Sequence, residues 1–130
     1  MPHLVLQNTR TLFRTLFVAA LIAVFWLALQ PAPDIVKLVS WQDKIEHAIL
    51  FAVLMALGAL AWPRHLLTVA AGLLAYGAAM EVAQSFTGYR VGDVWDWVAD
   101  ALGVAAMAFP ARHWLTRRAA RTPNSARTQA

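Results

Sequence analysis

The stretch LLTVAAGLLAYGAAMEVAQSF, residues 66–86, decides the fold of this chain. It is a run of mostly apolar residues about as long as a helix must be to cross the hydrocarbon core of a bilayer. Glu81 interrupts the run near its far end. An ionisable carboxylate at that depth is costly and needs a partner, so it marks a candidate functional site. The stretch therefore predicts a membrane-spanning helix that carries a polar group.

The composition of the whole chain also indicates a membrane protein. Of the 130 residues, 60% are hydrophobic and only 14% are charged. This length allows about four spanning helices with short loops, and no separate soluble domain of ordinary size. The absence of cysteine excludes disulfides, thiolate nucleophiles and thiolate metal ligands. We therefore expect an all-α, polytopic bundle of about four transmembrane helices.

The N-terminal part of the chain predicts a basic lead followed by the first helix. Residues 1–14 are polar and basic, and an apolar segment covers about residues 15–29 before Gln30, Pro31 and Pro33 end it. A cleaved signal peptide is the competing interpretation of this segment. Its end lacks a good small-x-small cleavage site, which favours retention of the helix.

Three more helices are expected after a loop that extends to Val39. Ser40 can cap the second helix, which continues to Trp62 and is broken by the proline that follows. The third covers residues 66–86, and Asp93 is placed to cap the fourth, which runs to about Phe109 or a little beyond.

These elements predict one membrane domain, residues 15–116, between a cytoplasmic lead and a cytoplasmic tail. The tail, residues 117–130, is rich in arginine, threonine and alanine and is expected to be disordered.

The distribution of charge predicts the orientation of the helices in the membrane. Cytoplasmic flanks of membrane helices collect lysine and arginine. With both termini inside, eight basic residues fall inside (Arg10, Arg14, Arg64, Arg112, Arg117, Arg118, Arg121 and Arg127) and three fall outside (Lys37, Lys44 and Arg90). All seven acids fall outside. The net charge of +4 is thus the sum of +8 inside and −4 outside, and the basic excess at the cytoplasmic ends indicates lipid contact or topology rather than nucleic-acid binding.

Helical spacing gathers the polar residues on one face of each of the last three helices. Side chains three or four positions apart share a face. Because lipid does not tolerate such polar stripes, we expect the three faces to meet beneath the outer surface, with Gly103 allowing close helix approach. The predicted polar cluster consists of Asp43, Lys44, His47, Glu81, Gln84, Arg90, Asp96 and Asp100.

Several of these residues also have purely structural interpretations. Asp43 and Asp93 can be helix caps, and His47 can be a hydrogen-bonded core residue. Asp96 and Asp100 can pair with Arg90 or Lys44. Glu81 is hardest to explain structurally, because the helix dipole disfavours an anion near a C-terminus. It requires a cationic partner, a metal ion or its own proton.

The last three predicted helices carry a spaced pattern of polar residues. It reads Asp43-Lys44-x-x-His47-x-x-x-Phe51, then Glu81-x-x-Gln84, then Arg90, Asp96 and an acid or amide at position 100 before Gly103. This pattern resembles that of the VanZ-like family of small bacterial membrane proteins. The match covers about residues 42–107. The resemblance implies a four-helix membrane protein whose namesake is linked to resistance to the glycopeptide teicoplanin. Position 100 is commonly asparagine in that family, and here it is Asp100.

Three functional hypotheses remain open. In the first, the outer polar cluster binds an amphiphile, such as a lipid-linked envelope component or a glycopeptide, without catalysis. In the second, the chain is an intramembrane enzyme acting on a lipid or lipid-linked precursor, with His47 as a base or metal ligand and the acids holding a divalent cation. The lack of a serine-hydrolase context and of an established metal-site spacing weighs against this enzyme hypothesis. In the third, the cluster only holds the helices together. No cofactor other than a divalent cation is implied, and the sequence does not indicate the oligomeric state.

Overall fold

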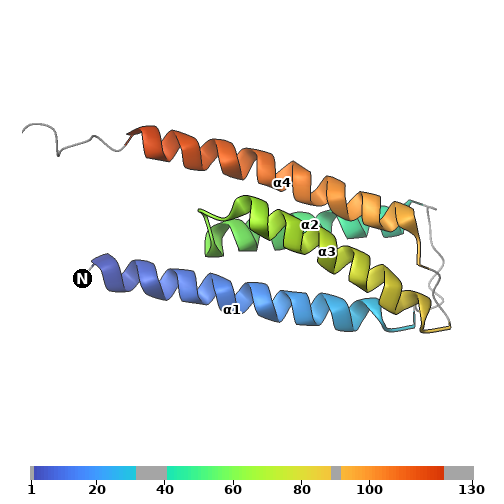
Figure 1. The fold of residues 1–130 in the computed structure, drawn as a ribbon. Coiled ribbons are helices and arrows are strands. Elements are labelled where there is room, and N and C mark those ends of the chain that lie inside the picture. Colours follow the sequence, from blue (N-terminus) through green and yellow to red (C-terminus); the bar gives the residue numbers. More distant parts are fainter. Residues whose placement is uncertain (1, 32–40, 89–91, 122–130) are drawn as a thin grey trace, which may run out of the picture.

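A computed structural model describes residues 2–31, 41–88 and 92–121 of the chain (Figure 1). These residues form four helices and no strand, so the predicted all-α class is confirmed for them. The helices are α1 (Pro2–Ala28), α2 (Gln42–Ala61), α3 (Leu66–Ser85) and α4 (Val94–Arg121).

Three of the four helices are long and apolar enough to cross a membrane. These spans are Gln7–Ala28 within α1 and the whole of α2 and α3. The fourth helix is longer, but charged residues at both ends shorten its apolar part. The chain therefore has the helices of a membrane protein.

Helix α2 lies at the centre of the bundle. It packs most extensively against α4, and it also contacts α1 and α3, whereas α1 and α4 lie on opposite sides (Figure 1). The core between the helices is apolar. It is formed by Phe17, Val24, Phe51, Leu54, Met55, Ala59, Leu73, Met80 and Val104.

Small residues allow the central pair of helices to approach closely. A Cβ atom on Gly103 would overlap the backbone of Ala48, so α4 can pack this tightly against α2 only with glycine at position 103. The expected role of Gly103 is therefore confirmed.

The two outer helices are longer than predicted. Helix α1 begins at Pro2, so residues 2–14 are helical rather than a lead outside the helix. No glycine or proline follows Pro2 before the end of α1, and proline is well tolerated in the first turn. Helix α4 continues through Pro110 to Arg121, so residues 117–121 of the expected disordered tail are also helical. The alanine, arginine and leucine residues after Pro110 favour helix strongly enough to continue it.

The inner helices end close to their predicted positions. Helix α3 stops at Ser85, and Gly88 then adopts a φ of 76°, a conformation that favours glycine. Helix α2 begins at Gln42, and the proposed Ser40 cap lies outside the described residues. The α2–α3 connection is short, which places the C-terminal end of α2 beside the N-terminal end of α3.

Candidate functional site

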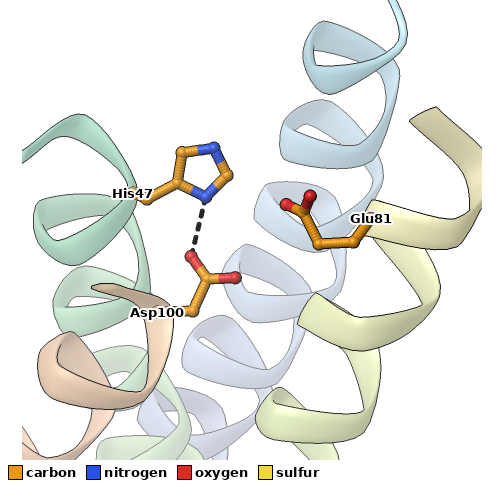
Figure 2. A group of neighbouring side chains, drawn as sticks. All are labelled: His47, Glu81 and Asp100. Atoms are coloured by element: carbon orange, nitrogen blue, oxygen red, sulfur yellow. Dashed lines mark hydrogen bonds and ion pairs between the residues drawn. The ribbon is translucent and has the colours of Figure 1, made fainter. Parts of the chain in front are cut away.

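Three of the predicted cluster residues converge at one end of the bundle. His47 comes from α2, Glu81 from α3 and Asp100 from α4, and their side chains point toward a common space with α1 behind them (Figure 2). His47 Nδ1 lies 2.8 Å from Asp100 Oδ1. We call these three residues the polar site.

The polar site contains two buried carboxylate oxygens that lack a donor. The Asp100 side chain is completely buried, and its Oδ2 has no hydrogen-bond partner among the described residues. The same is true of Glu81 Oε1. Buried polar atoms in native proteins are nearly always paired, so these two oxygens indicate a missing proton, cation or ligand donor.

The absence of a side chain on Gly77 makes room for Asp100. An added Cβ on Gly77 would lie 2.7 Å from Asp100 Oδ2 and 3.3 Å from the ring of Phe51. Phe51 is itself completely buried beneath the site. The carboxylate is therefore held between α3 and an aromatic ring, away from bulk solvent.

The other oxygen of Glu81 is fixed by the backbone. Its Oε2 accepts a hydrogen bond from the N–H of Asp93 at 2.8 Å. The neighbouring Gly92 permits this approach, because a Cβ there would lie 2.8 Å from the Glu81 carbonyl oxygen. The fixed Oε2 leaves Oε1 directed into the polar site.

An ion-pair cluster lies next to the polar site. Lys44 Nζ is 2.8 Å from Asp93 Oδ2 and 3.1 Å from Asp96 Oδ1, which confirms the expected pairing of Lys44 with Asp96. Asp93 also caps α4, because its Oδ1 accepts a hydrogen bond from Trp95 N at 2.9 Å. The hydrogen bond from Lys44, followed by that from the Trp95 N–H, lowers the pKa of the Asp93 carboxyl.

The remaining cluster residues lie elsewhere. Gln84 is buried and donates from Nε2 to the carbonyl of Ala28 at 3.0 Å, so it ties α3 to α1 rather than completing the polar site. Asp43 lies in the first turn of α2. Arg90, which was predicted to belong to the cluster, lies outside the described residues.

A small pocket adjoins the polar site on its α1 side. It has a volume of about 230 Å³, and His47 and Gln84 form part of its wall. Most of the other lining residues are apolar and include Leu27, Leu50 and Met80. Leu27 and Leu50 are 58% and 42% exposed, so the pocket opens toward the surroundings of the bundle.

Two features of the site were not predicted. The sequence indicated a side chain, a metal ion or a proton as the partner of Glu81, whereas the structure gives it the backbone N–H of Asp93. Asp93 was predicted only as a cap, and it also pairs with Lys44. A backbone donor carries no signal in residue type, although a glycine at position 92 before a capping aspartate is consistent with a tight approach.

The residues of the polar site fit the ligand preferences of a divalent cation. One donor atom from each of His47, Glu81 and Asp100 lies within 4.8 Å of the other two. Carboxylate oxygens suit Mg²⁺, Ca²⁺ and Mn²⁺, and a histidine nitrogen extends the range to Zn²⁺ and Fe²⁺. The two unpaired oxygens are the atoms that such an ion would satisfy.

Comparison with known proteins gives no family assignment. No protein-family model, curated protein or solved structure matches this chain.

Proposed function

We propose that this chain is a VanZ-like integral membrane protein that binds an amphiphilic component of the bacterial cell envelope. The cationic or hydrogen-bond-donating group of the ligand would lie between Glu81 and Asp100. The two unpaired carboxylate oxygens carry this proposal. Leaving a buried acceptor unpaired costs on the order of 1–3 kcal/mol, and more when it is charged, so a ligand donor is stabilising there. A cluster with a purely structural role would instead pair its own acceptors.

The surroundings of the polar site suit a molecule with a polar head and an apolar chain. The adjoining pocket is polar at Glu46, His47 and Gln84, and its other lining side chains are apolar. A head group could therefore reach the carboxylates while the hydrocarbon part stays in contact with Leu27 and Leu50. Such a ligand could enter from the membrane.

The orientation proposed with this function places the polar site at the outer face of the inner membrane and both termini in the cytoplasm. The distribution of charge supports this orientation. The described acids gather where α2 and α4 begin and α3 ends, while most of the arginines lie toward the opposite end of the bundle. The resemblance to VanZ-like proteins over residues 42–107 supports an envelope ligand, with glycopeptides such as teicoplanin as a candidate class.

The test is ligand-induced thermal stabilisation of the protein in lipid nanodiscs. Dodecylamine and dodecanol have the same chain and differ in the head group, and teicoplanin serves as a third probe. We expect the amine to raise the unfolding temperature of wild type more than the alcohol does. Glu81→Gln and Asp100→Asn should remain folded and lose this difference.

A matched control separates the site from general charge attraction. Asp43 lies in the first turn of α2, and it belongs neither to the polar site nor to the wall of the adjoining pocket. Asp43→Asn therefore removes one carboxylate at the same end of the bundle and leaves the unpaired oxygens in place. Equal loss of the amine effect in Asp43→Asn and Glu81→Gln would reject the proposed site.

A second candidate function is a divalent-metal-dependent enzyme acting on a lipid or lipid-linked phosphate. The three potential ligand atoms within 4.8 Å of one another favour it. His47, Glu81 and Asp100 would hold the ion, which would supply Lewis-acid activation of a phosphate oxygen. The fixed Oε2 of Glu81 and the burial of Asp100 would keep the ligand set oriented.

Metal titration distinguishes the two functions. Protein treated with EDTA is melted with Mg²⁺, Mn²⁺, Ca²⁺ or Zn²⁺ alone, and turnover is measured on a lipid phosphate. The enzyme hypothesis requires stabilisation by one ion that is lost in His47→Gln and Asp100→Asn but kept in Asp43→Asn. If no ion stabilises the wild type and no turnover occurs, only the binding function remains.

A further inference from the structure

A second candidate ligand site lies at the other end of the bundle. A groove of about 700 Å³ runs between the α2–α3 turn, the first turn of α3 and the C-terminal half of α4. Helix α4 continues to Arg121, well past this turn (Figure 1). The C-terminal half of α4, which extends past the turn, forms one wall of the groove.

The groove has a basic part without a counter-charge from the protein. Arg64, His65 and Arg112 line it. Among the residues that the structure describes, neither arginine forms an ion pair with a carboxylate, because the described acids lie at the opposite end of the helices. A guanidinium group presents a planar set of donors that matches a phosphate group. The basic part therefore suits an anion supplied from outside the chain.

The rest of the groove is apolar and open. Leu67 and Phe109, which line it, are 81% and 80% exposed. Leu67 lies at the start of α3, which is long and apolar enough to span a membrane, and large apolar side chains with this exposure on a membrane protein are expected to contact lipid chains. A binding partner must therefore combine negative charge with hydrocarbon.

We propose that this groove binds an anionic phospholipid of the surrounding membrane. The phosphate lies between Arg64 and Arg112, and the acyl chains cover Leu67 and Phe109. Basic pockets between transmembrane helices commonly bind such head groups. The first amides of α3 have no side-chain cap, so they add positive partial charge toward the same region. The groove does not include any residue of the polar site, so this proposal is independent of the function proposed above.

The experiment compares lipids with identical acyl chains and different head groups. Purified full-length protein in detergent is titrated with phosphatidylglycerol or phosphatidylcholine, and lipid adducts are counted by native mass spectrometry. We expect one tightly held phosphatidylglycerol and weaker binding of phosphatidylcholine. The double variant Arg64→Gln/Arg112→Gln should bind phosphatidylglycerol roughly tenfold or more weakly, since each arginine near an anionic head group contributes measurably.

The matched control removes the same charge from the same end of the molecule. Arg10 and Arg117 are exposed and do not line the groove. The variant Arg10→Gln/Arg117→Gln should therefore bind phosphatidylglycerol like wild type. Equal weakening in both double variants, or equal binding of the two lipids by wild type, would overturn the proposal.

Two further measurements make each outcome interpretable. Glycerol 1-phosphate, the water-soluble head-group fragment, should not displace the lipid at equal concentration, because it lacks the acyl chains. Displacement by the fragment would identify a phosphate site rather than a phospholipid site and would also overturn the proposal. If the double variant does not fold, the single variant Arg112→Gln, at an exposed position within α4, replaces it in the same comparison.

Discussion

Asp93 connects three helices at the polar-site end of the bundle through three different atoms. Its Oδ1 caps α4 at Trp95, its Oδ2 pairs with Lys44, and its backbone N–H donates to Glu81. The residue therefore links α2, α3 and α4 within one short segment. Substitution of Asp93 by asparagine removes the ion pair with Lys44 and keeps the cap of α4, because asparagine is also a good capping residue.

Asp93→Asn is predicted to change the acid sensitivity of the fold. Lys44 lowers the pKa of Asp93 below its ordinary value of 3.8, so the folded state binds this proton less readily than the unfolded state. The stabilisation is therefore present above pH 3.8 and is lost as the pH falls through the lowered folded pKa. Asparagine keeps the cap and removes the titration. Thermal unfolding of both proteins is measured at pH values above and below the pKa of Asp93. Wild type should be more stable than Asp93→Asn above that pKa, and the difference in stability should vanish below it. A difference in stability that does not change with pH would contradict the role of the ion pair.

Gly77→Ala is predicted to disturb the polar site more than the rest of the fold. The new methyl group would lie 2.7 Å from Asp100 Oδ2, so the carboxylate or α4 must move. Overpacking of this kind costs roughly 1–3 kcal/mol. Gly72→Ala on the same helix is the control, because a Cβ there meets no atom within 4 Å. Thermal unfolding and metal or amine binding should be impaired in Gly77→Ala alone, and equal behaviour of the two variants would refute the close contact.

The sequence identifies the residues of the polar site better than their partners. Spacing of three or four places His47, Glu81 and Asp100 on stripes that must avoid lipid, and the structure brings these three together. The same rule also placed Gln84 in the cluster, but Gln84 hydrogen-bonds to α1. Spacing within one helix cannot give the rotation of that helix against its neighbours. It also cannot reveal a backbone donor such as the Asp93 N–H.

At the scale of the elements, α1 is held to the bundle by polar as well as apolar contacts. Phe17 and Val24 are its buried side chains among those described. Tyr76 donates its hydroxyl to the Leu21 carbonyl at 2.6 Å, and Gln84 bonds to Ala28. These contacts join α1 to α3 along the side of the bundle away from α4.

Tyr76→Phe is predicted to loosen α1 without disrupting the core. The ring keeps its contacts with Phe25 and Phe51, and only the hydroxyl is lost. A hydrogen bond of this type contributes about 0.5–1.5 kcal/mol. Hydrogen exchange followed by mass spectrometry should show faster exchange in α1 than in wild type. Thr15→Val, which removes an exposed hydroxyl from α1, is the control; unchanged exchange in Tyr76→Phe would show that the hydroxyl does not hold α1.

The bounds of the elements were predictable where clear breakers occur. Pro63 and Gly88 mark the ends of α2 and α3, and both helices end within a residue or two of the expected positions. The start of α1 and the end of α4 were predicted wrongly because the expectation followed hydropathy, whereas helix formation continues into polar residues. Alanine favours helix more than leucine does, and arginine favours it about as well as leucine.

At the scale of the whole molecule, the separation of charge leads to a prediction of topology. The natural chain has no cysteine, so single cysteines report their position without background. Val94, which is 74% exposed, lies at the acidic end, and the exposed Thr116 lies toward the basic end. In intact cells, a membrane-impermeant maleimide should label Val94→Cys directly and Thr116→Cys only after permeabilisation. The reverse pattern would place the polar site in the cytoplasm and contradict the proposed orientation.

The pairing of α2 with α4 also has a consequence for biosynthesis. Lys44 and Asp96 are 52 residues apart, with the whole of α3 between them. At ribosomal speeds of about 5–20 residues per second, Lys44 waits roughly 3–10 seconds for its partner to be made. During this interval Lys44 and His47 are in place on α2 before Asp96 and Asp100, their partners on α4, have been made. The newly made hairpin of α2 and α3 is then a target for insertion chaperones and for membrane proteases. It stops being one when α4 has been synthesised and has packed against α2.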